Sequence, residues 1–184
     1  MSSFAQPQTQ IRPFLRSDAT LVSRLDSTFI TGEQYVVRRT SEGLALIRTA
    51  LKRTASKTFP LDLGADPWEQ GFVCQVDGRI CGFVGGQFQE WNRRLVIWHF
   101  YVDSKCRGKG LGRMLMREML AWGRSHDACA AWVETSNLNA PGVRAYEKLG
   151  FRICGFDESL YFGTENAAEF ALFLSNAPVR LSAP

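Results

Sequence analysis

The pattern of hydrophobic and polar positions is clearest in the middle of the chain, where it predicts three antiparallel strands. FVCQV (72–76) and RICGFVGGQF (79–88) are apolar-rich runs joined by Asp77-Gly78, a dipeptide typical of a two-residue hairpin turn. After the polar turn WNRR, the run LVIWHFYVD (95–103) predicts a third strand. We therefore expect an antiparallel meander in this region.

Two later segments have the period of a helix. The run LGRMLMREMLAWGRS (111–125) carries its apolar residues on one stripe. The run NAPGVRAYEKLG (139–150) predicts a shorter helix. Asn139 can cap its start, Pro141 suits its first turn, and Gly150 can end it.

Other apolar runs predict strands on both sides of these elements. They are IRPFL (11–15), EQYVVRR (33–39), LALIRTAL (44–51), ACAAWVETS (128–136), FRICGF (151–156) and EFALFLS (169–175). The second and third flank TSEG and predict a hairpin, whereas TASKTFPLDLGADPW (54–68) has no clear period and predicts a long loop. The fold class is therefore α/β or α+β, with a central mixed, mostly antiparallel sheet flanked by helices.

A chain of 184 residues is long enough for one domain with a full core. We expect a single domain over residues 11–176, a flexible N-terminal tail over 1–10 and a C-terminal tail over 177–184. The last predicted strand, EFALFLS, could pair within the chain or across a homodimer, and the pattern leaves both open.

Charge and hydropathy exclude several classes of protein. Lysine and arginine (22) exceed aspartate and glutamate (18) by four, a mild excess that fits an anionic ligand but does not indicate a nucleic-acid partner. The N-terminus MSSFAQPQTQ has no pattern of a signal peptide. The longest apolar run, about eight residues, is far too short to span a membrane. We expect a cytoplasmic protein with no membrane partner.

The cysteines and histidines do not predict a metal site. The five cysteines are scattered without a CxxC pair, and the chain has two histidines. Cys74 and Cys81 are placed symmetrically about Asp77-Gly78, so a two-residue hairpin turn would put them opposite each other. We nevertheless expect buried, reduced thiols, because a cytoplasmic protein is kept reduced.

The stretch CRGKGLGRML (106–115) combines three glycines with three basic residues just before the long helix. It does not fit a Walker A loop, because Lys109 is followed by glycine and leucine instead of serine or threonine. It fits a dinucleotide-binding loop poorly, because residue 113 is arginine. What remains is a strand, then R-x-x-G-x-G, then a helix N-terminus, which is an arrangement suited to a pyrophosphate. The alternative is a glycine-rich turn with solvated charges.

Together with WVETSNLNAPGVRAYEKLGF (132–151), this stretch resembles the GNAT superfamily of N-acetyltransferases. Arg107-x-x-Gly110-x-Gly112 is similar to the family's acetyl-CoA pyrophosphate loop, and Asn139, Tyr146 and Gly150-Phe151 match its N…Y…GF signature. One departure is Gly142, where the family usually has alanine. LDSTFITGEQYVV (25–37) and CGFDESLYFGTENAAEFALFL (154–174) further resemble the streptothricin-type acetyltransferases.

The resemblance implies how acetyl-CoA would be held. Backbone groups near Tyr101 and Val102 would meet the pantetheine arm and the acetyl group, and Asn139 would meet the pantetheine from a neighbouring strand. The pyrophosphate and nearby phosphates would lie on the loop formed by Arg107, Gly108, Lys109, Gly110, Gly112 and Arg113. The acceptor amine would attack the thioester directly, with no metal and no covalent enzyme intermediate.

The resemblance also supplies the candidate acid and base. By its place in the N…Y…GF signature, Tyr146 would protonate the leaving thiolate. Some members of the superfamily have a glutamate base where this chain has Glu134, which ranks first here. His99, on the central strand, is the second candidate base, because an unperturbed histidine titrates near neutrality.

Three functions compete. The first is acetyl transfer from acetyl-CoA to a primary amine of a small cationic molecule, such as a streptothricin-like antibiotic. The second is acetylation of protein N-termini or lysines, and the third is a non-catalytic acyl-CoA-binding regulatory module. The first predicts an acidic acceptor cleft, for which the candidates are Asp62, Asp66, Glu69, Glu33 and Glu134.

Overall fold

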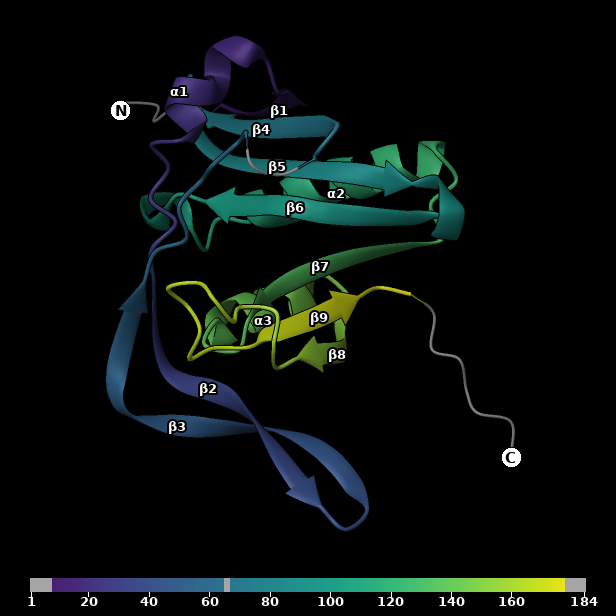
Figure 1. Ribbon diagram of the computed structural model, residues 1–184. Helices are drawn as coiled ribbons and strands as arrows, with labels where there is room; N and C mark the ends of the chain where they lie inside the picture. Colours follow the sequence, from purple (N-terminus) through teal and green to yellow (C-terminus); the bar gives the residue numbers. More distant parts are fainter. Residues whose placement is uncertain (1–7, 65–66, 178–184) are drawn as a thin grey trace. The chain divides into compact units, whose positions relative to one another are not determined.

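The computed structural model describes residues 8–64 and 67–177, which fold into two compact units (Figure 1). The first unit combines the segment up to Ser27 with Phe59–Ala131, and the second combines Thr28–Thr58 with the segment from Trp132 onward. Among the described residues, no helix has the length and apolar character needed to cross a membrane.

The first unit is built on four strands in the order β1-β4-β5-β6, and each neighbouring pair is antiparallel. This confirms the predicted meander and its Asp77-Gly78 turn, in which both residues have positive φ. The strands are β1 (Thr9–Pro13), β4 (Gln70–Val76), β5 (Arg79–Gln89) and β6 (Arg94–Val102), and a short 3-10 helix, η2 (Glu90–Asn92), links the last two.

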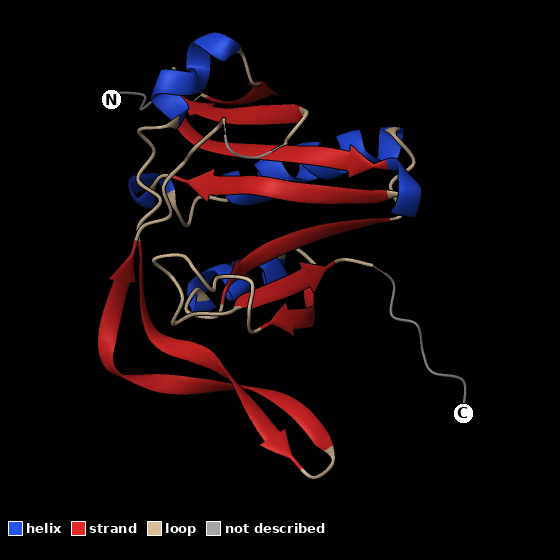
Figure 2. Cartoon of the chain, viewed as in Figure 1, coloured by secondary structure: helices blue, strands red, loops and turns tan. Residues whose placement is uncertain are grey.

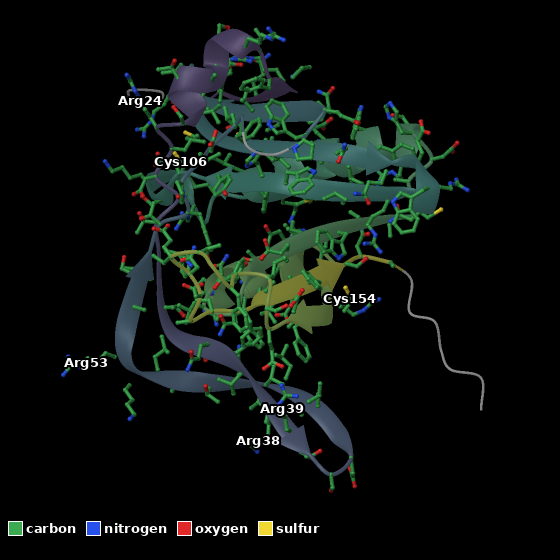
Figure 3. The ribbon with its side chains drawn as sticks, viewed as in Figure 1. Arg24, Arg38, Arg39, Arg53, Cys106 and Cys154 are labelled. Atoms are coloured by element: carbon green, nitrogen blue, oxygen red, sulfur yellow. The ribbon has the colours of Figure 1, made fainter. Side chains whose placement is uncertain are left out.

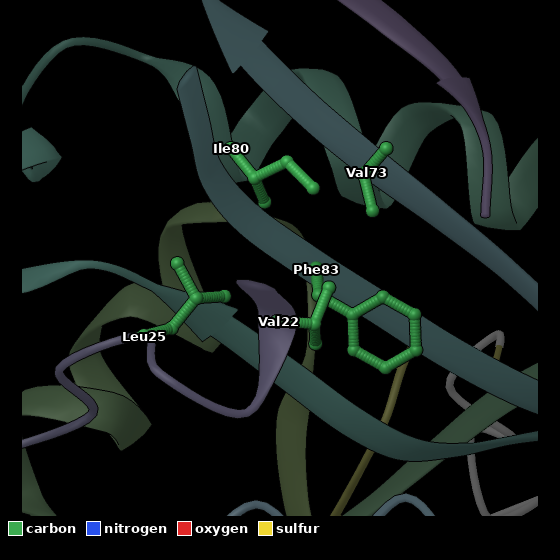
Figure 4. Packing of buried hydrophobic residues seen from close by; sticks show 5 residues of the cluster. All are labelled: Val22, Leu25, Val73, Ile80 and Phe83. Carbon is green, nitrogen blue, oxygen red and sulfur yellow. The ribbon is translucent and has the colours of Figure 1, made fainter. Parts of the chain in front are cut away.

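Helices pack on this sheet (Figure 2). They are α2 (Leu111–Ser125), which packs on β4, β5 and β6, and the short helices η1 (Arg16–Asp18) and α1 (Ala19–Val22). Side chains from α1, the segment after it, β4 and β5 form a buried apolar cluster of Val22, Leu25, Val73, Ile80 and Phe83 (Figure 4). On the α2 side, glycines make room for the helix: a Cβ at Gly82 would lie 2.9 Å from Leu115 Cδ1.

The second unit contains the hairpin of β2 (Phe29–Thr40) and β3 (Gly43–Lys57). It also contains most of β7 (Ala130–Ser136), with β8 (Arg152–Asp157) and β9 (Ala171–Ser175). Strand β9 pairs antiparallel with both β7 and β8. The segment EFALFLS therefore pairs within the chain, and neither edge of β9 is left for pairing across a homodimer.

Helix α3 (Ala140–Lys148) packs against β2 in the second unit. The buried Asn137 fixes this region: its Nδ2 donates to the Tyr35 carbonyl (2.9 Å), and its Oδ1 accepts from the Phe170 N–H (3.1 Å). One side chain therefore ties the turn before α3 to β2 and to the residue before β9.

Several predicted boundaries are wrong. Thr9 and Gln10 were expected in a loose tail but pair with β4, because the strand continues beyond its apolar run. Residues 54–57 were expected in a loop but extend β3, because Phe29, Ile30 and Thr31 supply pairing partners. The expectations for residues 1–7 and 178–184 lie outside the described residues. Ala177 is described, and its N–H donates to Ser175 Oγ (3.1 Å).

Cys74 and Cys81 are buried and free, as predicted, but they do not lie opposite each other across the hairpin. Cys74 lies opposite Gly82, because the register between β4 and β5 shifts beyond Gln75. Cys81 instead has its Sγ 2.7 Å from Cys106 Sγ. None of the five cysteines is in a disulfide in the structure.

Candidate active site

The glycine loop follows β6 and the 3-10 helix η3 (Ser104–Cys106) and leads directly into α2. Gly108 and Gly110 have φ of 78° and 80°, and a Cβ at either would meet nothing within 4 Å. These two positions therefore need glycine for its left-handed backbone. Gly112 has a different reason: its Cβ would lie 3.2 Å from Phe100 Cζ, so glycine lets α2 approach β6 closely.

The start of α2 presents backbone donors. The N–H of Met114 donates to the Gly110 carbonyl (3.2 Å) as the first bond of the helical ladder. The N–H groups of Leu111, Gly112 and Arg113 precede that ladder, at the helix end that carries partial positive charge. Lys109 and Arg113 are exposed beside them. The geometry suits an anion such as a pyrophosphate.

Arg107 braces this loop. Its Nε donates to the Val102 carbonyl (2.9 Å), and its Nη2 donates to the Asp26 carbonyl (3.3 Å). Ser104 Oγ adds a bond to Asp26 Oδ2 (2.6 Å). In the structure the guanidinium thus holds the end of β6 and the segment after α1 together, which fixes the direction in which the loop leaves the strand.

Strand β6 contains a bulge close to its candidate residues. Gly85 pairs with His99 and Gly86 pairs with Ile97, so Trp98 is an extra residue with no partner position on β5. A bulge bends its strand and redirects the side chains around it. Tyr101 and Val102, the residues predicted to meet the pantetheine arm, lie beyond it at the end of β6.

His99 lies in aromatic surroundings. It is 3% exposed, and its ring centroid lies 5.9 Å from Phe83, 6.2 Å from Tyr101 and 6.3 Å from Trp68. His99 therefore packs within a group of aromatic side chains of the first unit.

Asn139 caps α3 as predicted. Its Oδ1 accepts from the Gly142 N–H (2.9 Å), and its Nδ2 donates to Thr135 Oγ1 (2.9 Å). A Cβ at residue 142 would fall 2.2 Å from Nδ2, so the glycine that departs from the family pattern allows this capping geometry. A pantetheine contact from the Asn139 side chain would have to share or displace these bonds.

The G-F pair supports Tyr146 on α3. Gly150, with φ of 90°, ends the helix, and the Phe151 N–H donates to the Tyr146 carbonyl (3.0 Å). The Phe151 ring then lies against Tyr146, with 5.8 Å between ring centroids. Tyr146 is 8% exposed. Phe151 therefore contacts Tyr146 twice, through a backbone hydrogen bond and through its ring.

Glu134, on β7, accepts a short hydrogen bond from the phenol of Tyr161 in the β8–β9 connection. Burial is the largest cause that raises the pKa of Tyr161, followed by the charge of Glu134 and this hydrogen bond. Beside it, Lys57 Nζ contacts the Glu169 carboxylate at 2.5 Å, and Ser136 donates to the same carboxylate.

This cluster (Glu134, Tyr161, Glu169, Lys57 and Ser136) was not predicted as a group. Tyr161 and Glu169 lie in the segment CGFDESLYFGTENAAEFALFL, which carried part of the family resemblance, and that segment was the available signal. Lys57 is 112 residues from Glu169 in sequence, near the start of the predicted loop 54–68, and nothing in its local pattern indicated the pair.

The predicted acidic residues do not form one group within a unit. Asp62 and Glu69 belong to the first unit, Glu33 and Glu134 belong to the second, and Asp66 lies outside the described residues. The charge of Glu33 is already matched, because Arg144 donates to it and Arg48 lies 3.6 Å away. Glu134 instead accepts a hydrogen bond from Tyr161, within the second unit.

The predicted site residues divide between the two units. The glycine loop, His99, Tyr101 and Val102 belong to the first, whereas Glu134, Asn139 and Tyr146 belong to the second. In the described part of the chain, no group of three or more histidine, cysteine, aspartate or glutamate side chains is placed to hold a metal ion.

A glycine-rich loop at the N-terminus of α2, followed by a strand and then by a helix capped by Asn139, agrees with one protein class. The model of the acetyltransferase (GNAT) family matches residues 39–151, and the chain belongs to this family. It is an N-acetyltransferase with acetyl-CoA as cosubstrate.

Individual relatives agree with this class. The chain is 37% identical to the streptothricin acetyltransferase of Streptomyces lavendulae over 169 residues, which cover 86% of this chain and 89% of that protein. The crystal structure of nourseothricin acetyltransferase matches with a TM-score of 0.82 and 34% identity, over 91% of this chain and 96% of the other. These matches confirm the predicted α/β fold with its mixed, mostly antiparallel sheet.

A more distant structure supports the fold alone. A Bacillus anthracis protein solved in complex with acetyl coenzyme A matches with a TM-score of 0.77 and 23% identity, over 91% of this chain and 98% of the other.

Proposed function

We propose that this enzyme acetylates a primary amine of a small polycationic antibiotic of the streptothricin type. The observation that carries the proposal is the 37% identity to a streptothricin acetyltransferase over nearly the whole of both chains. The match therefore extends beyond the coenzyme motifs into the parts of the chain that distinguish one acetyltransferase from another. The 34% identity to nourseothricin acetyltransferase supports the same substrate class.

In the proposed complex, the pyrophosphate of acetyl-CoA lies on Gly108–Gly112. The N–H groups at the start of α2 and the charges of Lys109 and Arg113 support this role, because charge-assisted hydrogen bonds to phosphate are strong. We assign Tyr101, Val102 and Asn139 to the pantetheine arm, as the family resemblance implies.

For the reaction, we assign Glu134 as general base and Tyr146 as general acid. Glu134 removes a proton from the acceptor ammonium, the freed nitrogen attacks the thioester carbon, and the C–S bond breaks. The thiolate of coenzyme A takes the proton of the Tyr146 phenol. We rank Glu134 above His99, because Glu134 already holds a polar hydrogen bond whereas His99 is packed among aromatic rings.

The test is release of coenzyme A thiol from acetyl-CoA across a panel of acceptors: streptothricin, aminoglycosides, polyamines and short peptides. We expect turnover with streptothricin well above the other amines. Turnover with peptides alone would replace the proposal with protein acetylation, and binding of coenzyme A without turnover of any amine would indicate a regulatory module.

A pair of variants tests the base within the same assay. Glu134→Gln should lower turnover at neutral pH and should lose less at high pH, where the amine is already deprotonated. Glu42→Gln, an exposed glutamate at the hairpin turn, is the matched control. A pH-independent loss, or no loss, in Glu134→Gln would remove this residue as the base.

A further inference from the structure

Tyr161 is the partner that the fold brings to Glu134. The two residues are 27 positions apart in sequence, and the phenol oxygen of Tyr161 donates to Glu134 Oε1. The pKa of Tyr161 is raised, first by burial and then by the negative charge of Glu134. A phenol in this setting keeps its proton at neutral pH, so Tyr161 acts towards Glu134 as a donor.

The neighbouring carboxylate does not compete for this donor. Glu169 also raises the pKa of Tyr161 through its charge, but more weakly than Glu134. Its own charge is compensated by Lys57 Nζ, which lies 2.6 Å and 2.5 Å from its two oxygens, and Ser136 donates to it as well. The lysine therefore neutralises one glutamate of the cluster, while the phenol is directed at the other.

We propose that Tyr161 is a positioning residue for the general base. Its hydrogen bond fixes the rotamer of Glu134 and stabilises the charged carboxylate, which keeps Glu134 ready to take the proton of the acceptor ammonium. The proposal rests on the assignment of Glu134 as base. Tyr161 itself exchanges no proton with the substrate in this role.

The sign of the expected effect follows from the hydrogen bond. A donor to the charged form lowers the pKa of a carboxyl group, so its removal raises that pKa. Tyr161→Phe should therefore raise the pKa of Glu134, because the charged carboxylate loses a hydrogen-bond donor. On the acid limb of the pH profile, fewer molecules then carry the base in its active form.

The first test is independent of the acceptor. Carboxyl resonances are titrated by NMR in the full chain labelled with ¹³C-glutamate, and the Glu134 resonance is assigned by its absence in Glu134→Gln. We expect its pKa to rise in Tyr161→Phe and to stay unchanged in Tyr35→Phe, the same substitution at another buried tyrosine of the second unit. An unmoved Glu134 pKa in Tyr161→Phe overturns the proposal.

The second test is kinetic, with streptothricin and acetyl-CoA. Tyr161→Phe should move the acid limb of the kcat/KM profile to higher pH, lower kcat/KM on that limb and converge with the parent enzyme well above it. A shift of the limb is measured within one variant, so a smaller folded fraction cannot imitate it. Tyr161→Gln, which retains a donor, should recover part of the shift.

The double variant separates the inference from the proposed function. Tyr161→Phe should cost nothing further in a Glu134→Gln background, and an equal loss in both backgrounds would show that Tyr161 acts independently and overturn the positioning role. If Glu134→Gln keeps the parent pH profile, the base assignment fails. If Glu134→Gln loses activity while Tyr161→Phe keeps the parent profile, only the positioning role fails.

Discussion

The candidate sites of the two units differ in the groups that form them. In the first, the proposed coenzyme loop (residues 107–112) depends on the backbone: two glycines with positive φ and the N–H groups at the start of α2. In the second, the Glu134 cluster is built from side chains of β3, β7 and the β8–β9 connection. A site made of backbone groups uses consecutive residues and can be recognised in the sequence. A site made of side chains combines residues that are far apart in sequence, so it is recognised only in the folded structure.

The largest expected effect tests the chemistry of the second unit. Tyr146→Phe should lower kcat by roughly 100-fold, because it removes the proposed proton donor to the leaving thiolate. Binding of acetyl-CoA, measured by calorimetry, should change little. Tyr35→Phe is the matched control, since both tyrosines are 8% exposed. Equal losses in the two variants would show that Tyr146 contributes packing and not a proton.

A smaller effect tests whether side chains hold the second unit together. Lys57→Met leaves the Glu169 carboxylate without its cation in a site where both side chains are largely buried. We expect the free energy of unfolding in urea to fall by about 2 kcal/mol. The exposed pair of Arg39 and Glu158 is the control, and Arg39→Met should cost less than about 1 kcal/mol.

Arg39 lies on the hairpin together with Arg38 and Arg53, which are labelled with it in Figure 3. If the loss in Lys57→Met is no larger than the loss in Arg39→Met, the buried cluster does not stabilise the unit. The contrast between a backbone site and a side-chain site would then not extend to stability, because the side-chain cluster would not help to hold the second unit together.

The next effect tests the backbone site. Gly110→Ala forces a side chain into a left-handed conformation, which costs about 1–2 kcal/mol. The loop should relax away from its binding geometry, so KM for acetyl-CoA should rise roughly fivefold to 10-fold. Gly78→Ala is the control, because Gly78 has nearly the same φ as Gly110 but lies in the β4–β5 turn of the same unit. Gly78→Ala should lose similar stability without a change in the KM for acetyl-CoA. An equal rise in KM in both variants would show that the affinity for acetyl-CoA does not depend on the conformation of the glycine loop.

The same contrast decides what the sequence could predict. The meander, both longer helices and the glycine loop follow local rules of turns, caps and periodicity, and the structure has them near the expected positions. The capping of α3 by Asn139 was predicted from the local sequence for the same reason, and the structure confirms it. Lys57 with Glu169, and Glu134 with Tyr161, pair over 112 and 27 residues. No local rule reaches that far, so these contacts appear only once the chain is folded.

The register error has the same origin. Symmetry about Asp77-Gly78 placed Cys74 opposite Cys81, but a shift beyond Gln75 moves Cys74 to Gly82. A bulge depends on how the sheet bends over its helices, which is tertiary information. The contact between Cys81 and Cys106, from β5 to η3, likewise depends on the fold.

The smallest expected effect on the enzyme concerns these thiols. Cys129 and Cys154 are exposed, whereas Cys74, Cys81 and Cys106 are buried. Burial raises the pKa of Cys74 to about 11. Burial, followed by the hydrogen bond with Cys106, raises the pKa of Cys81 to about 12. At pH 8 these two thiols are almost wholly protonated, and a protonated thiol is a poor nucleophile.

Labelling of the native protein with a thiol reagent at pH 8 should therefore modify Cys129 and Cys154 quickly and leave kcat within about twofold, because surface changes are usually mild. Cys106 and Cys154 are labelled in Figure 3, and mass spectrometry distinguishes their peptides. All five cysteines should react once the chain is denatured. Fast labelling of Cys81 in the native protein would mean that the base of the coenzyme loop opens readily, and that the backbone site is less rigid than the side-chain cluster.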